Sequence, residues 1–166
     1  MREKRVAEAQ CYKENLAEPS FSQGAVSVSK AKNRQHRKDG CQVICGIGLD
    51  IVERDRMLQK IADQRFVARI LVPEEQKIFN QLSPKRKTEF LAGRFSAKEA
   101  YAKAKGTGIG ASLSFQDICI IDDPAGKPVL TSRLDHGEYT HVSITHTRES
   151  AAAVVVIESL SGQSAY

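Results

Sequence analysis

The sequence lacks tryptophan and has no long apolar segment. Its longest apolar run, residues 151–157, is far shorter than the roughly 20 residues that a membrane-spanning helix needs. The first 20 residues alternate charged and polar side chains and contain no apolar stretch of the kind found in signal peptides. We therefore expect a soluble protein that does not enter a membrane.

Common metal and nucleotide motifs are also missing. The four cysteines show neither a secretory context nor the C-x-x-C spacing of a zinc site, so we expect reduced thiols in a cytoplasmic protein. There is no P-loop, and the pair Gly46 and Gly48 has no third glycine to complete a dinucleotide fingerprint. This pair predicts only a close approach of two backbones.

The positive charge is concentrated at the beginning of the chain. The formal net charge is +5, but residues 1–42 carry nine Lys and Arg against five Asp and Glu, whereas the rest carries sixteen against fifteen. Residues 1–42 have few large apolar side chains, so we predict a disordered or non-native extension. Residues 43–158 are predicted to form one domain, and residues 159–166 a flexible tail.

The predicted elements follow the apolar periodicity. Residues 43–52 form a β-branched run typical of a mostly buried strand, and residues 54–71 have helical spacing. A shorter helix is predicted to begin at residues 72–75. The strongest helical pattern covers residues 83–105, with Ser83 as N-cap and Gly106 just past the end.

Strands are predicted in the second half of the chain. Residues 115–121 and 128–131 flank a turn-like segment, and residues 141–147 and 150–157 flank a short polar one.

Asp50 is a carboxylate within an otherwise apolar strand. A buried carboxylate is costly unless it is paired, hydrogen-bonded or bound to a cation. An equally weighted alternative is that Asp50 caps the following helix.

Phe95, Glu99 and Lys103 are spaced to share one face of the long predicted helix. On this helix alone, Glu99 and Lys103 favour a surface ion pair worth a few tenths of a kcal/mol. Two separated carboxylates, a lysine and glycine-rich turns together suggest Mg²⁺ and a pyrophosphate substrate, because Mg²⁺ prefers carboxylate, phosphate and water oxygens.

Residues 141–147 form a strand with histidines and hydroxyls near its end. Alternation places Val142, Ile144 and His146 on one face and His141, Ser143 and Thr145 on the other. Such side chains can bind phosphate, but a histidine in a strand is more often structural.

Four ordered segments resemble the motifs of bacterial holo-acyl-carrier-protein synthases. They are GIGLDI at residues 46–51, FLAGRFSAKEA at 90–100, GTGIG at 106–110 and HVSITHT at 141–147. The resemblance covers residue 43 to about residue 158. It implies the α+β fold of 4'-phosphopantetheinyl transferases, with an antiparallel sheet, a long packed helix and a homotrimer with active sites between subunits.

The resemblance also implies roles for individual residues. Asp50 and Glu99 would hold Mg²⁺ and, with Lys103 facing the phosphates, form the catalytic group. Coenzyme A would be bound by Arg94, Gly106, Gly108, Gly110, Ser143, His146 and Thr147. A serine of acyl carrier protein would attack the β-phosphorus of coenzyme A, with either Glu99 or a metal-bound water taking its proton.

The basic residues of the first predicted helix are expected to meet an acidic carrier protein, although they do not share one stripe. They are Arg54, Arg56, Lys60, Arg65 and Arg69. Two other classes remain: a non-catalytic coenzyme A or nucleotide-binding module, favoured if binding needs no Mg²⁺, and a nucleic-acid-binding protein. The near-neutral charge of residues 43–166 and the core-like positions of the aromatics disfavour the latter.

Overall fold

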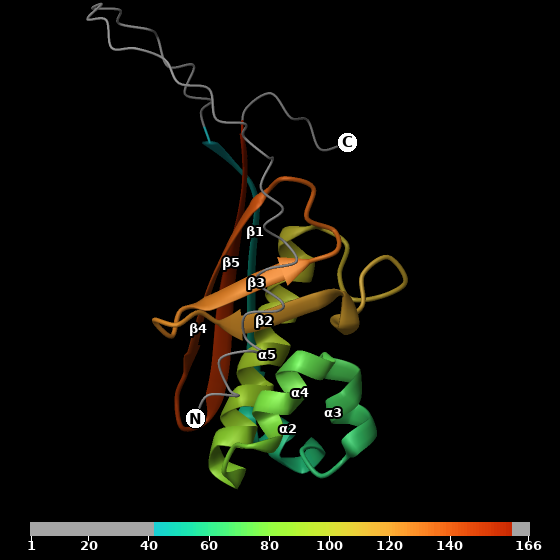
Figure 1. The fold of residues 1–166 in the computed structure, drawn as a ribbon, viewed down its shortest axis with the longest axis vertical. Coiled ribbons are helices and arrows are strands. Elements are labelled where there is room, and N and C mark those ends of the chain that lie inside the picture. The colour runs from blue at the N-terminus through green and yellow to red at the C-terminus, as the bar shows by residue number, and fades with distance from the viewer. Residues whose placement is uncertain (1–41, 161–166) are drawn as a thin grey trace, which may run out of the picture. The chain divides into compact units, whose positions relative to one another are not determined.

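The computed structural model describes residues 42–160, and this part of the chain has an α+β fold (Figure 1). A three-stranded antiparallel sheet has the order β1-β5-β4, and a separate antiparallel hairpin pairs β2 with β3. The elements in chain order are β1 (Gln42–Glu53), α2 (Arg54–Lys60), α3 (Gln64–Ile70), α4 (Pro73–Asn80), α5 (Pro84–Ala104), the 3-10 turn η1 (Phe115–Asp117), β2 (Ile118–Asp122), β3 (Pro128–Ser132), β4 (Tyr139–His146) and β5 (Ser150–Leu160). The predicted α+β class is confirmed. The predictions for residues 1–41 and 161–166 lie outside the described residues.

Helix α5 lies along β1 and β5 and is the centre of the core (Figure 1). Ala97, Ala100 and Tyr101 of this helix are fully buried together with apolar side chains from both sheets. The predicted boundaries are confirmed, since α5 has Ser83 at the N-cap position and Gly106 follows its end with a φ of 72°. No helix in residues 42–160 combines the length and apolar character that crossing a bilayer requires.

The helix predicted for residues 54–71 is wrong, because the structure contains two short helices there. Helix α2 ends at Lys60 and α3 begins at Gln64. The carboxylate of Asp63 accepts the backbone N–H groups of Arg65 and Phe66, so this residue caps a new helix. The predicted strand at residues 115–121 is likewise shorter, because its first three residues form η1.

Strand β1 is not mostly buried, as its apolar run had suggested. Its side chains alternate: Gly48 and Val52 are buried beneath α5, whereas Ile47, Leu49 and Ile51 are 64%, 64% and 68% exposed on the other face. Helix α5 covers only one face of this sheet, so a continuous apolar sequence gives an apolar outer surface. We call the exposed Ile47, Leu49 and Ile51 the outer face of β1.

The predicted close approach at Gly46 and Gly48 is confirmed. A Cβ atom on Gly48 would lie 1.9 Å from the carbonyl oxygen of Ala100, and one on Gly46 would lie 2.4 Å from that of Ala104. Both obstacles are backbone atoms of α5, which cannot rotate away as a side chain can. The glycines therefore let β1 lie directly against α5, and this contact positions Asp50.

Replacing Gly48 by alanine should therefore destabilise the fold. The added methyl group must push β1 and α5 apart, and overpacking of this kind costs about 1–3 kcal/mol or more. Thermal unfolding of Gly48→Ala should show a clearly lower Tm than the wild type. Gly110→Ala is the matched control, because nothing lies within 4 Å of a Cβ at that position; equal effects of the two substitutions would contradict this account of the β1–α5 contact.

Candidate active site

Asp50 and Lys103 meet where β1 crosses α5. The Nζ atom of Lys103 donates to Oδ1 of Asp50 at 2.8 Å and to the carbonyl oxygen of Leu49 at 3.1 Å. The Asp50 side chain is only 14% exposed, whereas that of Lys103 is 52% exposed and reaches solvent. The helix-cap alternative for Asp50 is wrong, because Glu53 occupies the N-cap position of α2.

The second carboxylate oxygen of Asp50 lacks a protein partner. Its Oδ2 atom is buried and accepts no hydrogen bond from the described residues. An unpaired buried acceptor costs free energy unless water or a cation satisfies it. Asp50 therefore offers a negatively charged oxygen that is available to a ligand.

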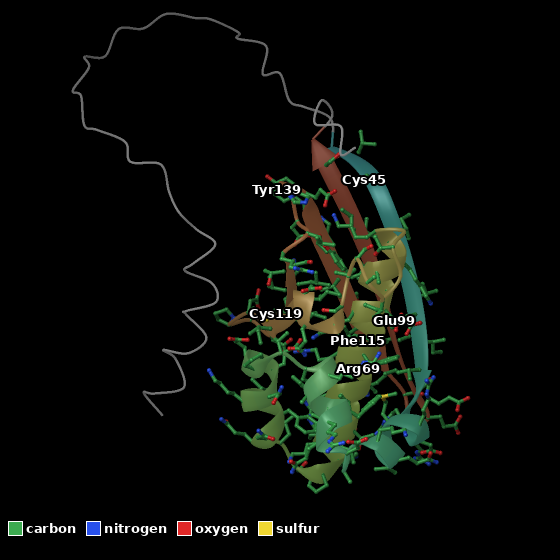
Figure 2. All side chains as sticks on the ribbon, turned by 90° about the vertical axis from the view of Figure 1, so that its right-hand side faces the viewer. Cys45, Arg69, Glu99, Phe115, Cys119 and Tyr139 are labelled. Carbon is green, nitrogen blue, oxygen red and sulfur yellow. The ribbon has the colours of Figure 1, made fainter. Side chains whose placement is uncertain are left out.

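Glu99 adds a second carboxylate to this site from α5, one turn before Lys103. Partial burial raises the pKa of Glu99 above its ordinary value of 4.5, and the Asp50 carboxylate raises that pKa further, against the lowering effects of Lys103 and Arg56. Figure 2 shows Glu99 on the side of α5 next to β1. The predicted surface ion pair of Glu99 and Lys103 is wrong, because Lys103 pairs with Asp50 instead.

The two carboxylates fit a magnesium ion that also binds substrate. Within residues 42–160 no cluster of three or more His, Cys, Asp or Glu side chains forms a complete protein cage for a metal. Mg²⁺ does not need one, because it is commonly held by one or two carboxylates together with phosphate oxygens and water. Asp50, with its unpartnered oxygen, and Glu99 are the residues that would hold it.

The glycine turn begins three residues after Lys103. Gly106 and Gly108 have φ values of 72° and 63°, which favour glycine, and a Cβ at either position would meet nothing within 4 Å. The N–H groups of Gly106 and Gly108 are bonded to carbonyls in the last turn of α5, and that of Gly110 to Leu113. The turn thus leaves its glycine Cα positions uncovered, while its three glycine N–H groups bond within the local structure.

Ser143, His146 and Thr147 lie on β4 and the turn after it, apart from the Asp50 group. Ser143 stands opposite Val154 on the uncovered side of the sheet, whereas Asp50 is directed toward α5. His146 is exposed at the end of β4. The hydroxyl of Thr147 accepts the backbone N–H groups of Glu149 and Ser150 and orders the turn. Ser143 therefore lies on the opposite face of the sheet from Asp50, whereas the strand registers place His146 on the same face as Asp50 but two strands away.

Arg94 is buried and already paired. Its Nη2 atom donates to Oδ1 of Asp122 at 3.0 Å, and its guanidinium lies 4.4 Å from the ring centroid of Phe90. The Nε atom has no partner among the described residues. Arg94 thus has a buried donor that no described residue satisfies.

The basic residues near the amino end of the domain have different surroundings. Arg54 donates to the carbonyl oxygens of Thr147 and Arg148 and pairs with Glu89, so its side chain is only 14% exposed and connects α2, α5 and the β4–β5 turn. Four others are exposed on α2 and α3: Arg56, Lys60, Arg65 and Arg69.

Sequence reasoning missed a buried ion pair next to Glu99. The Nζ atom of Lys98 lies 2.6 Å from Oε2 of Glu75, and both side chains are 0% exposed. Lys98 lies within a recognised motif, but no local pattern identifies Glu75 in α4 as its partner.

Comparison with known proteins identifies the family. The model of the 4'-phosphopantetheinyl transferase superfamily matches residues 46–156, more than half of the chain. A holo-[acyl-carrier-protein] synthase of Geobacillus sp. (strain WCH70) is 57% identical over 120 residues, covering 72% of this chain and 100% of that protein. The synthase of Bacillus subtilis (strain 168) is 56% identical over 121 residues, covering 72% and 99%.

Solved structures agree with this assignment. The holo-(acyl-carrier-protein) synthase of Bacillus anthracis str. Ames, in complex with CoA (3',5'-ADP), has a TM-score of 0.65 at 48% identity and covers 70% of this chain and 97% of that one. The Helicobacter pylori synthase in complex with coenzyme A has a TM-score of 0.60 at 34% identity, covering 67% and 98%. The chain belongs to the 4'-phosphopantetheinyl transferase superfamily.

Proposed function

We propose that this protein transfers the 4'-phosphopantetheine group of coenzyme A to a serine of apo-acyl carrier protein. The products are holo-acyl carrier protein, used in fatty acid biosynthesis, and adenosine 3',5'-bisphosphate. The observation that carries this proposal is the group of Asp50, Glu99 and Lys103 at the β1–α5 crossing, in a chain of this superfamily.

The catalytic roles follow from the charges of this group. Asp50 and Glu99 would hold Mg²⁺, which when bound neutralises the pyrophosphate of coenzyme A. Lys103, which is half exposed beside Asp50, donates to the same phosphates and stabilises negative charge on the departing adenosine bisphosphate. The carrier serine oxygen forms the new bond to the β-phosphorus and gives its proton to Glu99 or to water, while the bond from that phosphorus to the bridging oxygen breaks and its electron pair leaves with adenosine 3',5'-bisphosphate. Phosphoryl chemistry of this kind depends mostly on positioning and charge neutralisation.

Coenzyme A would be held at its nucleotide end by residues outside the catalytic group. The glycine turn, from Gly106 through Gly108 to Gly110, has no atom within 4 Å of a Cβ at these positions, so a phosphate group would be able to approach its backbone closely. Other polar contacts would come from the unused Nε donor of Arg94 and from Ser143, His146 and Thr147.

We further propose that the protein works as a homotrimer in the cytoplasm, with each active site formed between subunits. The apolar outer face of β1, consisting of Ile47, Leu49 and Ile51, provides a surface that a second copy would cover. Ser143 and Asp50 are directed to opposite sides of the sheet, so coenzyme A would contact both only if they came from different chains.

The transfer itself is tested by mass spectrometry of apo-acyl carrier protein incubated with the protein, coenzyme A and Mg²⁺. The carrier should gain the mass of one phosphopantetheine group, and a carrier with its acceptor serine replaced by alanine should gain none. Mg²⁺-independent binding of coenzyme A without any mass gain would favour the binding-module alternative and overturn the proposal.

Carrier docking is assigned to the exposed arginines Arg56, Arg65 and Arg69. Arg54 contributes by holding α2 against α5 and the β4–β5 turn. Opposite charges steer association, and this attraction is screened over about 10 Å at 0.1 M salt but about 3 Å at 1 M. The variant Arg56→Glu/Arg69→Glu should therefore raise the KM for carrier protein by on the order of tenfold at low salt. The difference from the wild type should shrink at high salt.

Lys127→Glu is the control for this experiment, because it reverses an exposed charge in the β2–β3 turn, away from α2 and α3. A KM for carrier protein that Arg56→Glu/Arg69→Glu leaves unchanged at low salt would exclude docking on these helices.

A further inference from the structure

Lys98 and Glu75 form a buried ion pair whose hydrogen bonds reach several elements. Lys98 Nζ donates to Oε2 of Glu75 at 2.6 Å, to the carbonyl oxygen of Ile70 at 2.7 Å and to that of Phe115 at 3.1 Å. Glu75 accepts the backbone N–H groups of Val72 and Ile120 at 2.9 and 3.0 Å. The two side chains therefore have partners for both charges inside the protein.

Three of the four bonded backbone groups lie at the ends of elements that surround α5, and the fourth lies within a strand. Ile70 is the last residue of α3, and Val72 is the N-cap of α4. Phe115 begins η1, and Ile120 is the middle residue of β2. Figure 1 shows α3 and α4 grouped beside α5, and the pair is the polar connection between that group and the long helix.

Stability alone gives a weak reason for this pair. Burying two charges carries a large desolvation penalty, and well-packed apolar residues often replace a buried ion pair without loss of stability. The burial of Lys98 is strong enough to lower its pKa despite the opposing effect of Glu75. Apolar residues could not form the hydrogen bond from Lys98 to Ile70 that fixes the end of α3 relative to α5.

The residues on either side of this connection belong to the proposed reaction. Lys98 directly precedes Glu99, and the carbonyl of Ile70 that it binds directly follows Arg69. Arg69, Phe115 and Glu99 are labelled in Figure 2 on the elements concerned. The pair thus connects α3, which bears the exposed docking residues Arg65 and Arg69, to α5 at the position that directly precedes Glu99.

We propose that Lys98 and Glu75 are positioning residues that hold the carrier-docking helix α3 in a fixed relation to Glu99. This inference rests on the proposed function. A carrier docked on α3 then presents its serine at a set distance from the pyrophosphate of coenzyme A. Misplacement by as little as 1 Å can reduce a rate by about a hundredfold.

The test uses Glu75→Gln, which keeps the side-chain shape and one acceptor oxygen but removes the ion pair, together with Lys98→Met/Glu75→Gln, which leaves neither charge buried alone. Each variant is assayed well below its own Tm, with circular dichroism to establish that it is folded. We expect kcat/KM for carrier protein to fall by on the order of tenfold to a hundredfold. The dissociation constant for coenzyme A, measured by calorimetry, should stay at the wild-type value.

Arg133→Met is the matched control. It breaks an ion pair with Asp117, in which the two charged atoms lie 2.7 Å apart and the arginine side chain is exposed to solvent. Folded variants of the Lys98–Glu75 pair with a lower Tm but a wild-type kcat/KM for carrier protein would reduce the pair to a structural role and overturn the inference. An equal loss of coenzyme A affinity would also overturn it, since the defect would then lie in the nucleotide site. If the wild type itself transfers nothing, the proposed function fails, and this inference fails with it.

Discussion

Asp50→Asn and Glu99→Gln should each reduce turnover by on the order of a hundredfold or more while the protein remains folded. Both substitutions keep the side-chain shape and remove a negative charge from the β1–α5 crossing, where the proposed cation meets the pyrophosphate. The measurement is the initial rate of carrier modification at saturating Mg²⁺ and coenzyme A. Glu53→Gln, on the same strand but exposed, is the control and should keep a normal rate. Near wild-type turnover in either folded variant would exclude the metal assignment.

The same Glu99→Gln protein has an expected pH signature in its stability. Burial and Asp50 raise the pKa of Glu99 in the folded protein, so folding favours the protonated form and Glu99 destabilises the fold as the pH rises through 4.5 and then through the raised pKa. In metal-free buffer, the Tm of Glu99→Gln should therefore rise relative to the Tm of the wild type as the pH increases across this window. A difference in Tm that is constant with pH would show that the folded protein does not raise the pKa of Glu99.

Mixing two inactive proteins, Asp50→Ala and His146→Ala, should restore part of the activity. Asp50 and His146 lie on β1 and β4, which are separated by β5 within one chain. If each site is formed between subunits, some interfaces of a mixed oligomer combine an intact Asp50 with an intact His146 from the neighbouring copy.

Native mass spectrometry of the mixture checks that subunits have exchanged. Exchanged oligomers without any recovered activity would contradict the site between subunits, as would a wild type that sediments as an active monomer.

The local patterns of this sequence predicted much of the fold. Helix α5 has Ser83 at its N-cap position, Pro84 in its first turn and Gly106 just past its end. Its boundaries therefore follow from the local backbone preferences of these residues. The closeness of β1 to another backbone followed from Gly46 and Gly48. Such features depend on neighbouring residues and are therefore readable from the sequence.

Features that depend on distant partners could not be predicted in this way. The apolar run of β1 suggested a buried strand, because sequence alone does not say that α5 covers only one of its faces. The break before α3 was missed because Asp63 was not recognised as a cap within a helical pattern.

The site was predictable in part. The proximity of Asp50, Glu99 and Lys103 followed from the family resemblance, whereas the pairing of Lys103 with Asp50 depends on how β1 and α5 cross. Glu75 gave no local signal, because its partner Lys98 is 23 positions away on another helix.

Cation binding in the presence of coenzyme A tests the central claim most directly. Mn²⁺ serves as a spectroscopic probe for Mg²⁺, and its binding is followed by electron paramagnetic resonance in the wild type, Asp50→Asn and Glu99→Gln. The account predicts that the wild type binds Mn²⁺ when coenzyme A is present and that each variant loses most of this binding, while Glu53→Gln keeps it. Wild-type Mn²⁺ binding in both folded variants would contradict the claim that these two carboxylates form the metal site.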